Sequence, residues 1–404
     1  MLKRVAYLDK IRPYYHSDFI KVISGVRRCG KSTLMKQIIE ELSATIQPDH
    51  IISINLEDYT YASYLDNPQE FHALLTTRMT DTDMYYIFLD EIQNLKDFQR
   101  VIASLKATRT CSLFVTGSNS RLLSGELATL LTGRTIEFLI MPFSYKETVE
   151  YLTEQGSPVS DETFYDYLLW GGLPSRFSLP QDTQIRAFIH ALYEGIVERD
   201  IFYRRTLQSP TIFRNFASFI LSLSGATVSA SSIAGYISAK EEKFSKSTAY
   251  TYLDYMEQAY LVTKASRFDL LGKKALVTLQ KYYAVDPGFI TITRGGSLDA
   301  LWTVLETVVY NEFLSRGFDV FVGKLRDHEI DFIVRSLGKT AYIQVAYLLS
   351  EPQTIEREFS ALKKIKDNRP KYVMSLDKAD MSQDGIIHLN IIDFLLQKKD
   401  LMFL

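Results

Sequence analysis

One stretch of this sequence decides its fold: Gly25-Val26-Arg27-Arg28-Cys29-Gly30-Lys31-Ser32. The stretch matches the phosphate-binding pattern G-x-x-x-x-G-K-[ST] at every fixed position. It lies between a predicted strand over 19–23 and a predicted helix over 31–42, which is the context that the pattern requires. Glycines let such a loop curve around a phosphate group, so that backbone N–H groups and the helix N-terminus point at its oxygens. We therefore expect a P-loop nucleotide site.

The P-loop also predicts which residues contact the nucleotide. Lys31 would add positive charge at the β and γ phosphates, and Ser32 would offer its hydroxyl to Mg²⁺. The full set of predicted nucleotide contacts is Gly25, Val26, Arg27, Arg28, Cys29, Gly30, Lys31, Ser32 and Thr33. The expected ligands are a nucleoside triphosphate and Mg²⁺.

A second predicted strand, over 85–90, ends in adjacent carboxylates. Its apolar run leads directly into Asp90 and Glu91. Burying two acids at the end of a strand is costly without a cation, which disfavours a purely structural explanation. We expect Asp90 to hold the Mg²⁺ shell and Glu91 to orient and deprotonate the attacking water. These residues predict hydrolysis in addition to binding.

Further polar residues are candidates for completing the catalytic site. Ser118 and Asn119 follow a predicted strand over 112–117, and we assign Asn119, with Ser118, to the γ-phosphate or the water. A simple turn or helix cap is the alternative for both. Arg134 is our choice as an arginine finger from a neighbouring subunit or as a sensor within the chain. The other arginine candidates are Arg27, Arg28 and Arg121, and for all four arginines the alternative is a surface position or a structural salt bridge.

The first 142 residues have the pattern of an α/β fold. Between about 15 and 141, short β-rich runs alternate with helical patterns, which is typical of parallel βα units. The remaining strands are predicted over 51–56 and 135–141, and the remaining helices over 71–79 and 98–108. We predict a parallel sheet with helices on both faces.

The composition changes after Pro142, where helical patterns rich in Tyr, Phe and Leu begin. A winged helix is then predicted by helices over 231–237 and 247–259 and by strands over 261–268 and 275–284. A third region reads as helix 301–316, strands 319–323, 329–335 and 340–345, helix 354–366 and strand 372–376. We divide the chain into a P-loop core (1–142), a helical region (143–225), a winged helix (226–288) and a C-terminal α/β domain (289–404).

The C-terminal domain resembles the restriction-endonuclease-like fold. It has the expected order of a helix with Glu306, a strand with Asp331, and a strand with Gln344 and Ala346. An active nuclease of that type sets two acids and an E-x-K triplet around Mg²⁺. Here Gln344 replaces a metal-binding acid, and Ala346 replaces the lysine that activates water. We expect a degenerate domain that is kept for binding or assembly and has no nuclease activity.

The chain as a whole resembles a prokaryotic AAA-type ATPase family whose C-terminal part is a domain of unknown function. The resemblance is carried by residues 23–32, by Leu89-Asp90-Glu91-Ile92-Gln93, by Thr116-Gly117-Ser118-Asn119-Ser120, and by Gly133-Arg134 before Met141-Pro142-Phe143-Ser144. It implies an ATPase core and adenine as the preferred base, but it does not define a biological task.

Bulk properties restrict the partners and the compartment. With 46 basic and 48 acidic residues the net charge is −2, so any contact with nucleic acid must be local. The two cysteines, Cys29 and Cys111, fit small core or loop thiols in a reducing cytosol, and the six histidines show no ligand spacing. No stretch has the apolar length of a membrane span. We expect a soluble, cytoplasmic protein with no membrane partner.

The winged helix offers one local surface for DNA. Residues 245–251 could present polar groups to a groove, with Lys273 and Lys274 near phosphates. The alternative is a packing module or a protein-binding lid, and the modest basic surplus of this region does not decide between them.

Three functions compete. The leading hypothesis is an ATPase that couples hydrolysis to a conformational change relayed through the winged helix to the C-terminal domain, with an oligomer or a protein client as further expectations. The second is a nucleotide-gated switch that binds DNA or protein and hydrolyses slowly. The third, a small-molecule or nucleotide kinase, is weaker because the chain spends its remaining length on domains that supply no acceptor pocket.

Overall fold

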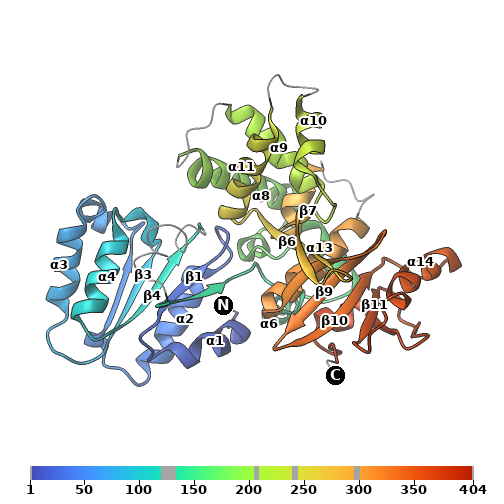
Figure 1. Cartoon of the computed structure of the whole chain (residues 1–404). Coiled ribbons are helices and arrows are strands. Elements are labelled where there is room, and N and C mark those ends of the chain that lie inside the picture. The colour runs from blue at the N-terminus through green and yellow to red at the C-terminus, as the bar shows by residue number, and fades with distance from the viewer. Residues whose placement is uncertain (1, 120–132, 204–208, 239–243, 295–300, 403–404) are drawn as a thin grey trace. The chain divides into compact units, whose positions relative to one another are not determined.

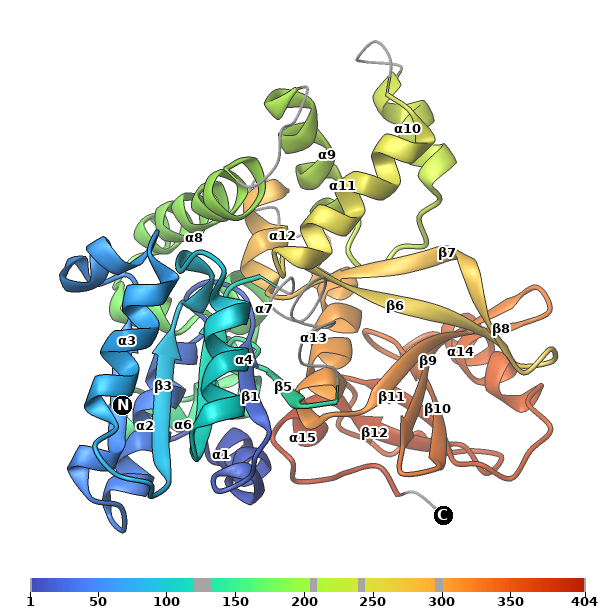
Figure 2. The ribbon, with the colours of Figure 1, turned by 60° about the vertical axis from the view of Figure 1, so that its left-hand side comes forward.

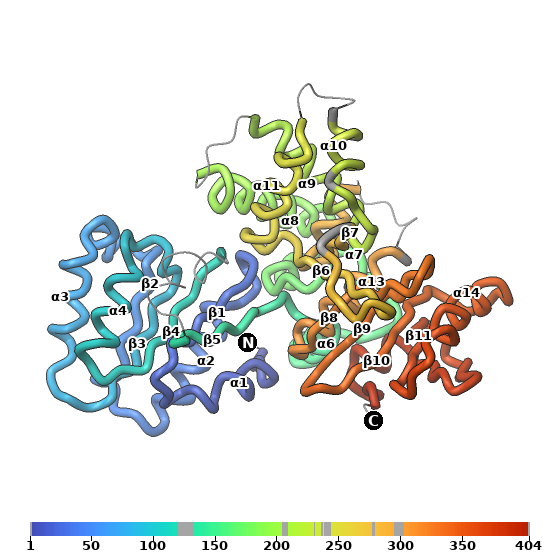
Figure 3. Tube along the Cα trace, in the orientation of Figure 1, coloured from blue at the N-terminus to red at the C-terminus, as the bar shows by residue number. Residues whose placement is uncertain are grey.

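The computed structural model describes residues 2–119, 133–203, 209–238, 244–294 and 301–402. The chain divides into two compact units (Figures 1 and 3), one made of Met1–Ile140 with Gln258–Tyr260 and the other of Met141–Glu257 with Leu261–Leu404. No helix among the described residues is both long and apolar enough to cross a bilayer.

The N-terminal unit is built on a five-stranded parallel sheet in the order β2-β3-β4-β1-β5. Its strands are β1 (Ile20–Ser24), β2 (Ile51–Asn55), β3 (Tyr85–Asp90), β4 (Cys111–Gly117) and β5 (Thr135–Leu139). The predicted parallel sheet is confirmed, and each strand lies within two residues of its predicted bounds. Every residue of β1, β3 and β4 is buried, which explains their continuous apolar runs.

Helices cover both faces of this sheet, as predicted. Figures 1 and 2 show α3 (Pro68–Arg78) and α4 (Phe98–Thr108) against one face and α2 (Lys31–Ser43) against the other. Pro68 is the first residue of α3, where its missing N–H costs no hydrogen bond. The short helices are α1 (Val5–Ile11), η1 (Arg12–Tyr14), η2 (Pro48–His50), η3 (Tyr59–Tyr64) and η4 (Ile92–Asn94).

The second unit begins with a helical region. The helices described in the second unit before residue 301 are α6 (Tyr145–Glu154), α7 (Asp161–Trp170), η6 (Pro174–Ser178), α8 (Asp182–Ile196), η7 (Val197–Phe202), α9 (Pro210–Ser222), α10 (Ala230–Ser238), α11 (Lys246–Gln258) and α12 (Pro287–Thr293). Ser144 and Glu147 form a capping box that satisfies two backbone N–H groups at the start of α6.

A mixed seven-stranded sheet forms the rest of the second unit, in the order β12-β11-β10-β9-β8-β6-β7. Its strands are β6 (Val262–Asp269), β7 (Lys274–Ala284), β8 (Asp319–Leu325), β9 (His328–Ser336), β10 (Lys339–Val345), β11 (Lys371–Ser375) and β12 (Ile387–Asn390). The helices of this part of the chain are α13 (Leu301–Arg316), α14 (Pro352–Lys363) and α15 (Ile391–Leu395). The predicted hairpin of β6 and β7 forms, but β6 also pairs in parallel with β8. The hairpin is therefore one edge of the same sheet that holds the C-terminal strands.

Asp286 ties the helical region to the end of β7. Its buried carboxylate accepts hydrogen bonds from the N–H groups of Gly172 at 2.8 Å and Gly288 at 2.9 Å, and burial raises its pKa to about 6. A Cβ at Gly172 would lie 1.9 Å from the carbonyl oxygen of Phe143, so glycine alone fits this approach. The Gly171-Gly172 pair thus permits close packing of three chain segments.

We expect Asp286→Ala to lower the free energy of unfolding of the second unit by about 2–3 kcal/mol, because two buried N–H groups lose their acceptor. Glu356→Ala removes a carboxylate from an exposed position of α14 and is the matched control. Urea unfolding followed by the fluorescence of Trp170 and Trp302 measures both variants. Equal midpoints for the two variants would contradict the assigned role of Asp286.

Lys21 is a fully buried cation in the middle of the N-terminal sheet. Its Nζ donates to Ser112 Oγ at 2.7 Å and to the Ser17 carbonyl at 3.3 Å, and it lies 4.5 Å from the centre of the Phe114 ring. Burial and the nearby charge of Lys106 lower the pKa of Lys21 to about 7.

This lowered pKa predicts a pH dependence of stability. Between pH about 7 and the unfolded pKa of about 10.4, the folded state binds fewer protons at Lys21 than the unfolded state, so the contribution of this group to stability rises with pH. Lys21→Met should therefore show a smaller gain in melting temperature from pH 7 to pH 9 than the exposed control Lys36→Met. An equal gain in both variants, measured by circular dichroism, would show that Lys21 titrates normally.

Candidate nucleotide site

The P-loop joins β1 to α2 through two glycines with left-handed φ angles. Gly25 has φ 141° and Gly30, the N-cap of α2, has φ 103°. A Cβ on Gly25 would lie 2.3 Å from the carbonyl oxygen of Ile140, which is closer than any side chain allows. Both fixed glycines of the sequence pattern are therefore required by backbone geometry.

Lys31 lies inside the loop. It is 4% exposed, and its Nζ donates to the carbonyl oxygens of Gly25 and Val26 at 3.1 Å each. These are neutral acceptors, whereas a phosphate offers charged oxygens to the same ammonium group. The side chain is thus held where an anion inside the loop would meet it, next to Ser32 and Thr33 in the first turn of α2.

A buried arginine supports the loop from behind. The Arg4 guanidinium donates to the Cys29 carbonyl at 3.1 Å, and its backbone N–H donates to Gln37 Oε1 at 3.1 Å. Arg4 is 1% exposed, and burial raises the pKa of the Cys29 thiol. The sequence prediction missed Arg4, since nothing in its local pattern distinguishes it from a surface arginine.

The two acids of β3 lie at the same edge of the sheet as the P-loop. Strand β4 lies between β1 and β3, and all three run in parallel, so their carboxyl ends meet. Asp90 is 8% exposed and Glu91 is 9% exposed. The structure therefore brings both predicted carboxylates to the edge at which Lys31 and Ser32 begin α2.

Thr116 of β4 links the two carboxylate residues. Its hydroxyl donates to the Asp90 carboxylate and accepts from the Glu91 N–H at 2.8 Å. Glu91 has a left-handed φ of 53°, and its carboxylate also accepts from the Gln93 side-chain amide. Thr116 and Gln93 were not predicted as site residues, although both lie in the stretches that carry the family resemblance.

Ser118 and Asn119 follow β4 directly and are buried, at 0% and 3% exposure. They lie at the same carboxyl edge as the acids, where the sensor prediction requires them. Their assignment to the γ-phosphate or the attacking water stays a prediction.

The arginine candidates are placed differently. Arg134 precedes β5, and its carbonyl accepts from the Ile20 N–H at the start of β1 at 2.8 Å. Its exposed side chain therefore lies at the amino edge of the sheet, and the structure does not bring it to the P-loop of its own chain. Arg27 is 3.7 Å from Glu57, Arg28 is exposed with φ 64°, and Arg121 lies outside the described residues.

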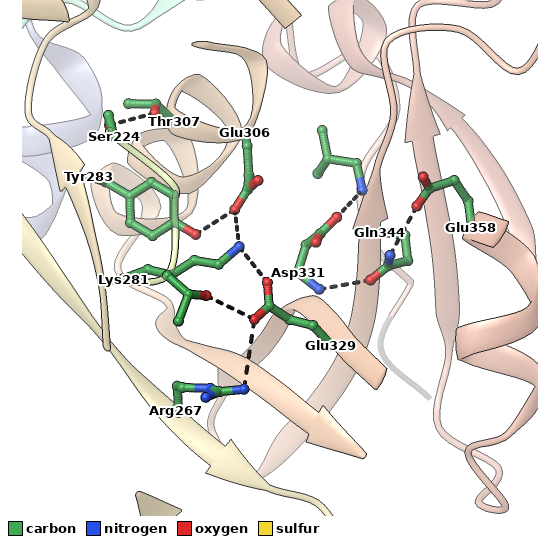
Figure 4. Close-up of polar contacts among 12 residues, drawn as sticks. Ser224, Arg267, Lys281, Tyr283, Glu306, Thr307, Glu329, Asp331, Gln344 and Glu358 are labelled. Carbon is green, nitrogen blue, oxygen red and sulfur yellow. Dashed lines mark hydrogen bonds and ion pairs between the residues drawn. The ribbon is translucent and has the colours of Figure 1, made fainter. Parts of the chain in front are cut away.

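The nuclease-like residues of the second unit do come together (Figure 4). Gln344 Oε1 accepts from the Asp331 N–H at 2.8 Å, and its Nε2 donates to Glu358 at 3.0 Å. Glu306 accepts from Lys281 at 2.9 Å and from the Tyr283 hydroxyl at 2.6 Å. Burial and the Glu306 charge hold the pKa of Asp331 well above its usual range.

This arrangement is an ion-pair network rather than a cluster of metal ligands. Lys281 also pairs with Glu329 at 2.8 Å, and although burial lowers its pKa, the surrounding carboxylates outweigh that effect and raise it. In the described part of the chain, only His50, Asp81 and Asp83 bring three ligand atoms within 4.8 Å of one another. His50 Nε2 already lies 3.0 Å from the Asp81 carboxylate, so two of the three groups are partners of each other.

Comparison with known proteins places this geometry in a family. The model of an AAA domain matches residues 17–149, and that of a domain of unknown function, DUF8612, matches residues 161–297. An uncharacterized protein of Haemophilus influenzae is 34% identical over 401 residues, which cover 98% of this chain and 99% of that protein. The chain belongs to this family of AAA-type P-loop proteins.

Other members and neighbours extend the likeness. An uncharacterized protein of Methanocaldococcus jannaschii is 31% identical to the present chain over 363 residues, which cover 86% of this chain and 79% of that protein. The Walker-type ATPase of Pyrococcus abyssi superposes with a TM-score of 0.50 at 17% identity, covering 73% of this chain and 96% of that one. The structural likeness concerns the fold, and the P-loop and both acids lie within the matched AAA domain.

Thr116→Val keeps the size of the side chain but removes both hydrogen bonds to the acids. We expect the free energy of unfolding of the N-terminal unit to fall by about 1–3 kcal/mol, because the Glu91 N–H stays buried without an acceptor. Thr116→Ser retains the hydroxyl and should lose clearly less. Urea unfolding followed by circular dichroism compares them, and equal losses would show that the hydroxyl does not hold the Asp90 carboxylate and the Glu91 N–H.

Proposed function

We propose that this AAA-type protein binds ATP with Mg²⁺ on the P-loop and hydrolyses it. The observation that carries the proposal is the pair Asp90 and Glu91, held by Thr116 at the edge of the sheet where Lys31 and Ser32 begin α2. A binding loop alone would not need a second acid there. The pair supports hydrolysis, because one carboxylate can serve the metal and the other the water.

Each residue of the site has a distinct task in this proposal. Backbone N–H groups of residues 25–33 surround the phosphates, and Lys31 neutralises charge on the β and γ phosphates. The Ser32 hydroxyl and the Asp90 carboxylate are hard oxygen donors of the kind that Mg²⁺ prefers, so they would hold the metal, which supplies charge neutralisation to the phosphates. Glu91 orients the water and accepts its proton, and Asn119 with Ser118 positions the γ-phosphate or the water.

The proposed output of hydrolysis is a conformational change relayed to the second unit. We infer that α10, α11 and the β6–β7 hairpin form a winged helix and that the C-terminal strands form a restriction-endonuclease-like domain. The absence of nuclease activity is supported by Ala346, which is buried at 7% exposure and offers no amine where the fold requires one. The second unit then serves binding or assembly.

A nucleotide-gated switch with slow hydrolysis is the second candidate. Ser245, Lys246 and Ser247 at the start of α11 are exposed, so they are accessible to DNA or to a protein client. Arg134 is also exposed, and a finger role for it requires a second copy of the chain. Both candidates share the nucleotide site and differ in the rate and the use of hydrolysis.

The test is Mg²⁺-dependent phosphate release from ATP by the purified chain. We expect Lys31→Ala to lose both nucleotide binding and phosphate release, because it removes the charge inside the loop. Glu91→Gln should keep ATP binding and lower release by about 100-fold or more, the range for loss of a general base. The matched controls are Lys36→Ala and Glu40→Gln, exposed positions of the adjoining α2.

The outcomes separate the candidates. Equal background rates in wild type and in both site variants would refute the ATPase proposal. Tight ATP binding with a rate that Glu91→Gln hardly changes would favour the switch. A rate per chain that rises with protein concentration and is lost in Arg134→Ala would support a finger supplied by a second copy.

A further inference from the structure

An open cavity of about 1210 Å³ lies on the second unit, apart from every residue discussed above as a nucleotide contact. Three hairpin turns and one connecting segment line it: the β6–β7 turn, the β8–β9 turn, the β9–β10 turn and the segment between α14 and β11. We call this cavity the hairpin groove. All of its lining residues belong to one compact unit, so its shape does not depend on the placement of the N-terminal unit.

The hairpin groove concentrates positive charge. Its six Lys and Arg side chains are Lys273, Arg326, Arg335, Lys364, Lys366 and Arg369. They face three acids, Asp319, Asp327 and Asp367, which leaves a formal surplus of three positive charges. The whole chain carries a net charge of −2, so this surplus is a local feature. Such a surface attracts an anion.

Several of these cations are available to a ligand. Among the described residues, Lys273, Arg326 and Lys366 are exposed and make no ion pair. Lys364 Nζ lies 2.5 Å from the Nε2 atom of His328, so its contact in the groove is a histidine ring and not a carboxylate. The groove therefore holds cations whose charge is not neutralised from within the protein.

Arg335 forms part of the groove wall in a fixed orientation. Its guanidinium lies 4.2 Å from the centre of the Phe268 ring and 5.0 Å from that of Phe321. Contact with two rings restricts the guanidinium, and among the described residues the Arg335 side chain has no hydrogen-bond or ion-pair partner, so its N–H groups can bind an anion. This residue differs from a mobile surface lysine, because part of its side-chain conformational entropy is already lost when the protein folds and is not lost again on binding.

The three hairpin turns also show backbone strain. Lys273, Arg326 and Leu337 have φ values of 48°, 55° and 48°. Glycine, asparagine or aspartate is favoured at such turn positions. Two of the three positions instead carry a long cationic side chain that faces the groove, at a local conformational cost. The strain is consistent with a requirement for charge at the turns.

We propose that the hairpin groove binds the sugar–phosphate backbone of double-stranded DNA. A small anion would meet only one or two of the six cations, whereas a duplex presents phosphates at regular spacing along the groove. A bilayer surface is flat and would not reach the stacked Arg335. The Phe and Tyr side chains of the lining do not form an exposed platform for unpaired bases, since Tyr342 is buried and Phe268 is covered by Arg335, which favours a duplex over a single strand.

The sequence predicted a DNA contact made by residues 245–251 with Lys273 and Lys274. Of these residues only Lys273 lines the hairpin groove, so the groove is a different site. We expect the hairpin groove to bind DNA independently of its base sequence, because its lysine and arginine side chains would contact phosphates. It is also independent of the ATPase proposal, so binding is measured without nucleotide.

The experiment is fluorescence anisotropy of a short labelled duplex titrated with the full chain over a range of salt concentrations. The groove variant combines Lys273→Ala, Arg326→Ala and Lys366→Ala. We expect its affinity to fall about 10-fold or more, and the slope of log K against log salt to shrink by about 2.7, since each phosphate contact contributes about 0.9. The control combines Lys378→Ala, Lys398→Ala and Lys399→Ala, which removes the same charge from outside the groove.

A second variant guards against a folding defect. Lys273→Arg, Arg326→Lys and Lys366→Arg keep every charge, so this protein should bind the duplex within about 3-fold of wild type. The proposal is overturned if the wild type does not bind duplex DNA at about 50 mM salt. It is also overturned if groove and control variants bind alike, or if single-stranded DNA, polyglutamate or anionic vesicles compete as well as unlabelled duplex.

Discussion

The close approach of Gly25 to the Ile140 carbonyl is the constraint on which the nucleotide site depends. The chain leaves β1 at Ser24, whose carbonyl accepts from the Ile140 N–H at 2.8 Å, so the segment after β5 lies directly against the start of the P-loop. A side chain at residue 25 would push the two segments apart. The loop then runs from this contact to Gly30, whose left-handed φ begins the first turn of α2.

Strand order then places the remaining groups without any local motif. In the order β3-β4-β1, one strand separates the strand that ends at Asp90 from the strand that leads into the P-loop. Thr116 on this intervening strand, β4, forms hydrogen bonds to both Asp90 and Glu91. A hydroxyl can donate to one acid and accept from the backbone of the next, which no apolar residue at this position could do. The geometry of the acids is thus a property of the sheet as much as of the sequence DEIQ.

The sequence was sufficient for the strands of the first unit and for expecting the P-loop and both acids at one edge of its sheet, because parallel βα units and the P-loop have strong local patterns. The chemical roles of these residues stay predictions. It did not reveal Arg4 or Thr116, since their partners lie 25 or more residues away. The position of Arg134 at the amino edge of the sheet could have been predicted from the sequence. In a parallel sheet, residues that precede a strand lie at the edge opposite to residues that follow a strand. The pairing of β6 with β8 could not have been predicted, because a hairpin pattern gives no information about a strand some 55 residues later.

The network in Figure 4 explains why a nuclease-like arrangement can persist without the chemistry of a nuclease. Gln344 donates to Glu358 through its amide, so a glutamate at 344 would set two carboxylates against each other. Lys281 comes from β7 of the hairpin and neutralises Glu306 and Glu329 of α13 and β9. Removing one partner would leave a buried charge unpaired, which is strongly destabilising. The retained acids therefore fix the hairpin to the C-terminal sheet, and this attachment orients the β6–β7 turn that carries Lys273 into the hairpin groove.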